Sequence, residues 1–152
     1  MIKKLLPFFL FSLLFSKSFF NVNLLYTKQT TSGSGFALSA GSEVNRYRIY
    51  TYIGEYVYDD YDIGDYAIGL DYLLSEDDFT PFVGISAHLI NNDDRNIQGF
   101  GIRTGLLYKA SSKFGASFYI ENIMPNNQKH ILNIAASLEY RFNSDIDITF
   151  LP

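Results

Sequence analysis

The sequence predicts an all-β fold, an eight-stranded antiparallel up-and-down β-barrel, and three observations lead to it. Polar, turn-rich clusters recur about every 10–15 residues beyond the N-terminal segment, which is the spacing of short strands joined by turns. Between these clusters, apolar residues alternate with small or polar residues, and successive side chains of a strand point to opposite faces. No segment carries a sustained apolar stripe of helical period, so a mainly helical fold is disfavoured.

The N-terminal segment is predicted to be a cleaved signal peptide. Lys3 and Lys4 precede an apolar run over residues 5–15, and this run is about half the ~20 residues that a membrane-spanning helix needs. Ser16 and Ser18 supply the small residues of a cleavage site after Ser18; an uncleaved membrane anchor is the alternative. The predicted organisation is a signal peptide at 1–18, a barrel at 19–142 and a short C-terminal tail at 143–152.

The first four predicted strands are residues 21–28, 36–42, 46–57 and 66–74. The outward residues of the last three are mainly apolar, namely Phe36, Leu38, Ala40, Tyr47, Ile49, Thr51, Ile53, Tyr66, Ile68, Leu70, Tyr72 and Leu74. The strand at 46–57 is the least regular, and its inner face is expected to carry Arg46 and Arg48. Tyr50 and Tyr52 fall on the same inner face, so the interior must accommodate two large rings.

The last four predicted strands are residues 79–90, 99–109, 114–123 and 131–142. Their outward residues include Val83, Ile85, Ala87, Leu89, Phe100, Ile102, Thr104, Leu106, Tyr108, Phe114, Phe118, Ile120, Leu132, Ile134, Ala136, Leu138, Tyr140 and Phe142. The predicted connectors between all eight strands are residues 30–35, 43–45, 59–65, 75–78, 91–96, 110–113 and 125–129. The final strand, 131–142, shows the alternation over the greatest length.

The less apolar face decides between a soluble and a membrane protein. It is rich in Gly, Ala and Ser, and it also carries the charged or polar residues Asp71, His88, Arg103, Glu121, Glu139 and Arg141. Small residues suit the narrow interior of a closed eight-stranded barrel, where charges of both signs can pair. The apolar face would then contact lipid, with strands of about 9–11 residues, as in a transmembrane barrel. A soluble lipocalin-like barrel, with the apolar face around a ligand, is the alternative.

Composition narrows the possible functions further. The chain has 152 residues, enough for one domain, with 12 Tyr, 14 Phe and no Trp. A formal net charge of −4 indicates neither a nucleic-acid-binding surface nor a polybasic membrane patch. The absence of cysteine excludes thiol catalysis, disulfides and Cys-ligated metals, and it is compatible with export to an oxidising compartment.

Three segments give the sequence a family resemblance: Thr80-Pro81-Phe82-Val83-Gly84, residues 101–108, and Leu138-Glu139-Tyr140-Arg141-Phe142. The last of these ends in an aromatic-x-aromatic pattern. Over about residues 20–142 the chain resembles the small bacterial outer-membrane β-barrels of the OmpX-like, Opa-like and OmpA-type families. Family members usually stop at the final aromatic residue, whereas this chain continues through 143–152. This tail is too short for a peptidoglycan-binding domain. Either it hangs in the periplasm, or Ile146, Ile148 and Phe150 extend or replace the closing strand.

The resemblance implies a location and partners. It implies a monomer in the outer membrane of a Gram-negative bacterium, with both termini in the periplasm. The external loops would be 30–35, 59–65, 91–96 and 125–129, which are short for an adhesin. The implied partners are outer-membrane lipid, lipopolysaccharide and the periplasmic and outer-membrane assembly machinery, with no nucleic acid.

Catalysis is considered because the resemblance extends to barrels that modify lipid A. Ser86 and His88 share a strand face and could form a Ser–His pair, with Asp71 or Glu121 orienting the histidine. The His-x-Ser-Asn pattern of lipid A deacylases is absent, and both residues are expected to point inward. We interpret them as members of a buried polar network.

The sequence predicts no catalytic residue, metal site or cofactor. The acidic runs at 59–62 and 92–94 contain oxygen ligands suited to Ca²⁺ or Mg²⁺, but neither has the spacing of an EF-hand. We interpret them as solvated loop charge, with divalent bridging to lipopolysaccharide phosphates as the alternative. The predicted function is a structural or surface-interaction role in the cell envelope. A narrow porin-like channel and a lipid A-modifying enzyme are the alternatives.

Overall fold

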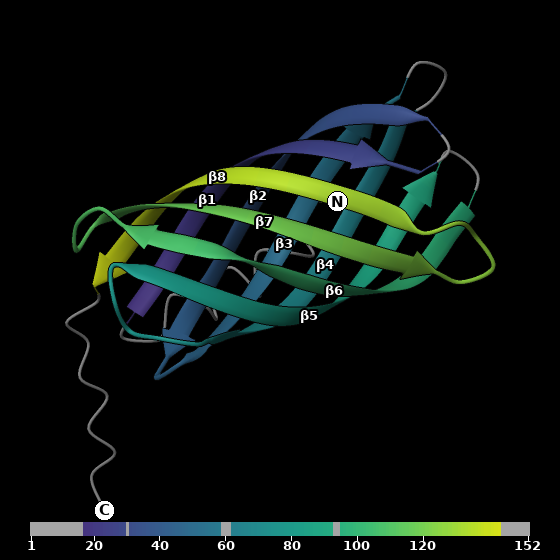
Figure 1. The fold of residues 1–152 in the computed structure, drawn as a ribbon. Coiled ribbons are helices and arrows are strands. Elements are labelled where there is room, and N and C mark those ends of the chain that lie inside the picture. The colour runs from purple at the N-terminus through teal and green to yellow at the C-terminus, as the bar shows by residue number, and fades with distance from the viewer. Residues whose placement is uncertain (1–16, 30, 59–61, 93–94, 144–152) are drawn as a thin grey trace, which may run out of the picture.

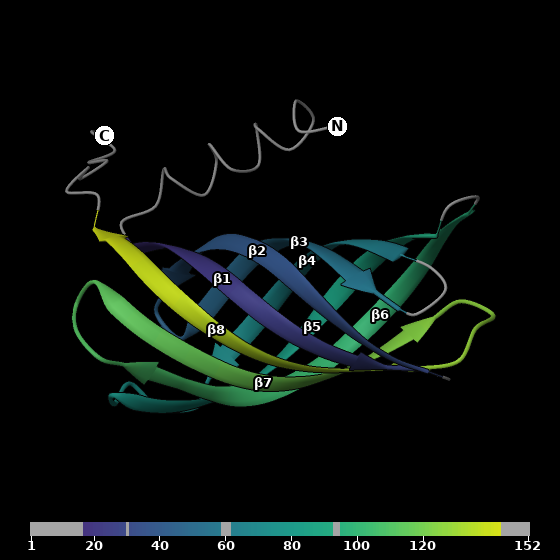
Figure 2. The same cartoon turned by 90° about the horizontal axis from the view of Figure 1, so that it is seen from above.

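The computed structural model describes residues 17–29, 31–58, 62–92 and 95–143, which form a closed antiparallel barrel (Figure 1). Each strand pairs with its neighbour in sequence, and β8 pairs with β1 to close the barrel. Both views show the two strands side by side (Figures 1 and 2). The strands are β1 (Lys17–Lys28), β2 (Ser32–Val44), β3 (Tyr47–Val57), β4 (Asp62–Leu73), β5 (Phe79–Asn92), β6 (Arg95–Lys109), β7 (Phe114–Pro125) and β8 (Ile131–Asn143).

The eight predicted strands are all confirmed, but four of them begin earlier than predicted, and β1 begins at Lys17 instead of Asn21. β2, β4 and β6 begin at Ser32, Asp62 and Arg95, inside segments that were predicted to be connectors. These segments are rich in Gly, Ser, Asp and Asn, which are typical of turns. Hydrogen bonding to the neighbouring strand overrides this preference for turns; Gly35 on β2, for example, pairs with Tyr56 on β3.

The two faces of the barrel are those that the alternation predicts. Outward side chains are apolar and exposed, with Leu24 at 67% and Leu138 at 73% of full exposure, whereas inward Asp71 and Glu139 are 1% exposed. This reverses the usual arrangement of a soluble protein, in which charged side chains face water. The soluble lipocalin-like alternative is wrong, because the apolar face does not surround a cavity.

Glycines opposite the large inward side chains make room for them. Tyr50 and Tyr52 both point into the barrel, as predicted, and both are buried. A Cβ on Gly69 would overlap the Tyr50 ring, and a Cβ on Gly54 would lie 2.6 Å from the Tyr52 hydroxyl oxygen. The irregular third strand therefore fits because Gly69 on β4 and Gly54 on β3 itself lack side chains at these points.

One end of the barrel, here called the turn end, carries three short connections between strands. They are residues 45–46, 74–78 and 110–113, and the described chain also begins and ends there, at Lys17 paired with Asn143. In the first turn, Asn45 has a positive φ of 56°, which asparagine tolerates well. The prediction that Arg46 faces inward is wrong. Arg46 lies in this tight turn, is exposed, and donates from Nε to Glu76 Oε1 at 3.2 Å.

Outward aromatic rings form a belt at the turn end. Tyr47 packs on Tyr72, Phe79 stacks on Tyr108 with 4.6 Å between ring centroids, and Tyr140 contacts both Phe114 and Phe142. Aromatic belts of this kind lie at the water interface of membrane barrels. The opposite end, here called the loop end, carries the other four connections.

Several predictions fall on residues that the structure does not describe. The signal peptide lies in this region apart from Lys17 and Ser18, which open β1, and so does the tail after Asn143. Most of the acidic runs, at 59–61 and 93–94, also lie outside the described residues. In the described ranges, no helix is long and apolar enough to cross a membrane.

The apolar outer face predicts a test in the middle of β6. Ile102 is 53% exposed and central in Arg95–Lys109, so Ile102→Arg should place a charge in hydrocarbon and destabilise the barrel by about 2–4 kcal/mol. Gln98→Arg, on the same face nearer the strand end, should cost about 0–1 kcal/mol. Denaturant titration of protein folded into lipid vesicles measures both values. Normal folding of Ile102→Arg in water without lipid would contradict a membrane-facing surface.

Candidate functional site in the barrel interior

The interior of the barrel holds three groups of charged side chains along its length. The turn-end cluster consists of Glu43, Arg48, Glu139 and Arg141. The central pair is Asp71 with Arg103. The third group, here called the histidine network, consists of Asp65, Ser86, His88 and Glu121.

Glu139 organises the turn-end cluster. Its buried carboxylate accepts one hydrogen bond from Arg48 Nη2 and another from Arg141 Nε, the latter at 2.7 Å. Arg48 also lies 3.7 Å from the carboxylate of Glu43 and stacks over the Phe19 ring at 3.9 Å. Two guanidinium groups therefore share two carboxylates, which compensates charges that would be costly to bury alone.

The central pair spans the middle of the interior. Arg103 donates from Nε to Asp71 Oδ1 at 2.7 Å and from Nη2 to Asp71 Oδ2, a bidentate ion pair. Its guanidinium lies 3.8 Å from the centroid of the Tyr50 ring and 4.8 Å from that of Tyr119. Phe82 completes the aromatic surroundings at 5.5 Å. The charge is held by one carboxylate and by aromatic faces that favour a cation.

The histidine network has the outline of a catalytic triad. Ser86 Oγ lies 2.8 Å from His88 Nε2, and His88 Nδ1 lies 2.9 Å from Asp65 Oδ2. The sequence predicted that Asp71 or Glu121 would be the acid that orients His88, and this prediction is wrong. Asp71 binds Arg103 instead, and Glu121 binds the serine side of the histidine.

Asp65 was missed because it was assigned to a connector. β4 begins at Asp62, so Asp65 has the same inward orientation as Asp71 along that strand. The period-two pattern, continued toward the N-terminus of the strand, would have found it. The chain also needs Gly101 on β6, because a Cβ there would lie 2.8 Å from Glu121 Oε1 and would overlap Ser86 Oγ.

The hydrogen bonds of this network differ from those of a catalytic triad, in which the histidine accepts the serine proton. Ser86 Oγ lies 2.6 Å from Glu121 Oε1, and a carboxylate can only accept, so the serine proton points to Glu121. His88 Nε2 then donates to the serine oxygen and to Glu121, while Nδ1 donates to Asp65. With a proton on each nitrogen, the imidazole has no lone pair with which to activate the hydroxyl. All four side chains are also buried in the barrel interior.

Tyrosines extend this network toward the loop end. Tyr56 donates to Asp65 Oδ2 at 3.1 Å and accepts from Asn133 Nδ2 at 2.9 Å, and its oxygen lies 2.7 Å from that of Tyr52. Farther along, Thr27 and Tyr58 share a hydrogen bond of 3.0 Å. Polar side chains thus occur along the described interior from Glu43 to Tyr58, between buried apolar side chains such as Phe82 and Ile123. No group of three His, Cys, Asp or Glu among the described residues could hold a metal ion.

The central pair predicts a large loss of stability when one partner is removed. Asp71→Ala leaves the buried Arg103 charge unpaired and should cost about 3–5 kcal/mol, whereas Asp71→Ala with Arg103→Met should recover most of it. Arg46→Gln breaks an exposed ion pair and is the control, with little change expected. Reversible unfolding in vesicles measures all three. Equal stability of Asp71→Ala and wild type would contradict a structural role for this pair.

The comparison with known proteins rests on solved structures, since no protein-family model and no curated protein matches the chain. The crystal structure of neisserial surface protein A is similar with a TM-score of 0.62 and 16% identity, covering 83% of this chain and 96% of that one. The N-terminal β-barrel domain of Pseudomonas aeruginosa OprF is similar with a TM-score of 0.64 and 14% identity, and the match covers 82% of this chain and 97% of that one. The Yersinia pestis attachment invasion locus protein Ail is similar with a TM-score of 0.55 and 12% identity, and the match covers 84% of this chain and 99% of that one.

One similar structure is that of a protein described as the outer membrane enzyme PagL, with a TM-score of 0.54 and 14% identity, covering 79% of this chain and 98% of that one. At these identities the comparisons establish architecture and carry no activity across. The chain therefore has the fold of the small eight-stranded outer-membrane β-barrels, as its closing strand predicted.

Proposed function

We propose that this protein is a monomeric, non-conducting barrel of the outer membrane that has a structural or surface-contact role in the envelope of a Gram-negative bacterium. One observation carries the proposal: an apolar outer surface surrounds an interior that is packed with paired charges and buried aromatic and aliphatic side chains. The outer surface supports insertion into lipid, because exposed Leu, Ile and Phe side chains are favourable there and unfavourable in water.

The proposed orientation places the turn end in the periplasm. Export would follow cleavage of the signal peptide after Ser18, giving a mature chain that starts at Phe19. The aromatic belt would then lie at the periplasmic interface, and the loop end would face outward toward lipopolysaccharide. The aromatic residues that end β8, Tyr140 and Phe142, would be available to the assembly machinery before the barrel closes.

A narrow pore is the first alternative function, and the central pair argues against it. A water path would have to pass Arg103, which is bound by Asp71 and surrounded by Tyr50, Phe82 and Tyr119. Eight strands enclose little more than the volume of their own side chains. The interior therefore supports a plugged barrel.

We expect no stable channel from the purified barrel in planar-bilayer recordings, because the interior charge pairs block ion passage. Insertion is verified in parallel by protection of the strands from protease. Arg103→Ala, which removes the central side chain, is the variant with which small currents are expected. Reproducible single-channel steps from wild type that disappear in an Arg103 variant would support the pore instead.

A lipid-modifying enzyme is the second alternative, and the triad-like outline of the histidine network is the observation in its favour. Lipid A mass spectra from a host expressing wild type, Ser86→Ala or His88→Gln should be identical to one another and to the host without the protein. The reason is that the histidine has no free lone pair beside the serine, and that the serine is buried. A lipid A species that appears with wild type and disappears with Ser86→Ala would make the protein an enzyme.

A further inference from the structure

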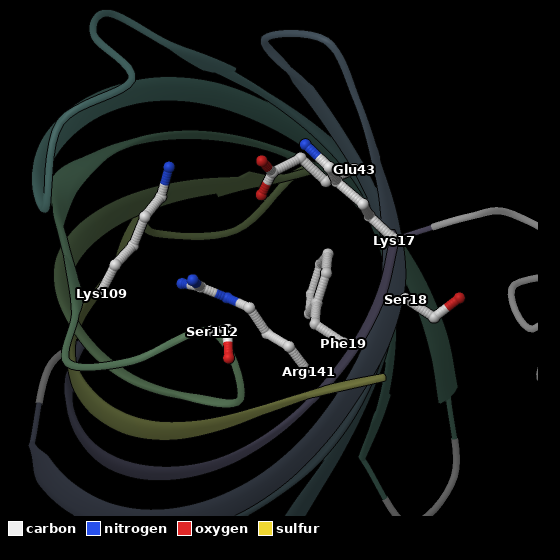
Figure 3. A pocket seen from close by; sticks show the side chains of 7 residues that line it. All are labelled: Lys17, Ser18, Phe19, Glu43, Lys109, Ser112 and Arg141. Carbon is white, nitrogen blue, oxygen red and sulfur yellow. The ribbon is translucent and has the colours of Figure 1, made fainter. Parts of the chain in front are cut away.

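A pocket at the turn end is left unused by the function proposed above. It has a volume of about 230 Å³ and is lined by Lys17, Ser18, Phe19, Glu43, Lys109, Ser112 and Arg141. Figure 3 shows side chains from β1, β2, β6, β8 and the β6–β7 turn around one opening inside the barrel wall, here called the mouth pocket; only the Ser18 side chain, among those drawn, points away from the opening. The backbone of the surrounding strands separates it from the lipid-facing surface.

The mouth pocket carries an excess of positive charge. Lys17, Lys109 and Arg141 line it against a single carboxylate, that of Glu43. Among the described residues neither lysine has an ion-pair partner. Low-dielectric walls around charges of one sign focus the field and raise the local concentration of counter-ions.

Two guanidinium nitrogens beside the pocket have hydrogen-bonding capacity to spare. Arg141 donates from Nε to Glu139, but its Nη2 is buried without a hydrogen-bond partner. Arg48 Nε, deeper in the barrel, is also unpartnered, since Glu43 Oε2 lies 3.7 Å away. Figure 3 shows the Arg141 guanidinium extended into the opening, on the side that faces Lys109. Buried donors are normally satisfied, so an acceptor from outside the described chain fits this position.

We infer that the mouth pocket is a binding site for an oxyanion, a phosphate or carboxylate group on a soluble molecule. A guanidinium with a free N–H and a nearby ammonium group form charge-assisted hydrogen bonds with such a group. The volume admits a phosphate with a few waters, each of which occupies about 30 Å³. In the orientation proposed above, the molecule arrives from the periplasm.

Signal-peptide cleavage after Ser18 would remove Lys17 but would preserve the charge of the site. The new α-amino group would be that of Phe19, which lines the same pocket. An α-amino group has an ordinary pKa of about 7.7–8.0 and is mostly protonated at pH 7. The pocket would therefore keep three cations in the mature chain, with Arg141 and Lys109 as the two permanent ones.

The test is an NMR titration of ¹⁵N-labelled protein, purified from membranes into detergent, with inorganic phosphate at constant ionic strength. Saturable shifts are expected at the Arg141 Nε–H and at the Lys109 amide. Lys109→Gln should weaken phosphate binding about tenfold, as expected for one lost charge-assisted hydrogen bond. Lys113→Gln, which removes an exposed charge from the same turn outside the pocket, is the matched control and should change the affinity less than about twofold.

The remaining arms separate the possible sources of the anion. The same Arg141 shifts in anionic phosphatidylglycerol nanodiscs without added phosphate would overturn the assignment to a soluble ligand. Shifts that do not saturate, or an equal loss in Lys109→Gln and Lys113→Gln, would overturn the site itself. These outcomes do not depend on whether the barrel conducts ions or modifies lipid.

Discussion

The pairing of β1 with β8 is the interaction on which the rest of the structure depends. Inside a bilayer no water is available to backbone N–H and C=O groups, so a sheet can cross only if its two edges bond to each other. Here they do so from Lys17 with Asn143 to Lys28 with Leu132. Closing only eight strands fixes a narrow interior, and that width determines which side chains the inner face can carry.

The narrow interior explains why glycines and charges occur together. Gly69 and Gly101 are empty positions into which Tyr50 and the histidine network extend. Buried charges are costly unless paired, and those of the turn-end cluster, the central pair and the histidine network each meet an opposite charge. The interior is thus packed with interlocked polar groups and with buried apolar side chains such as Phe82 and Leu107.

In the histidine network, triad-like distances between side chains are weaker evidence for catalysis than the directions of the hydrogen bonds. Three side chains have triad distances, yet the serine hydroxyl donates its hydrogen bond to the fourth, Glu121, and His88 then donates on both sides. The mouth pocket presents the opposite case. It has no catalytic outline, but its unpartnered Arg141 nitrogen and unpaired Lys109 leave binding capacity that the described chain does not use.

The sequence by itself determined the number of strands, the order of inward and outward residues, and the buried position of residues such as Arg103 and Glu121. These features follow from a period of two residues, which is a local property of the chain. Tertiary structure decided which charges meet, because the partner of each lies on another strand at a register that no local pattern specifies. Pairing across strands also extended β4 back to Asp62, which brought Asp65 to His88 and left Asp71 to Arg103.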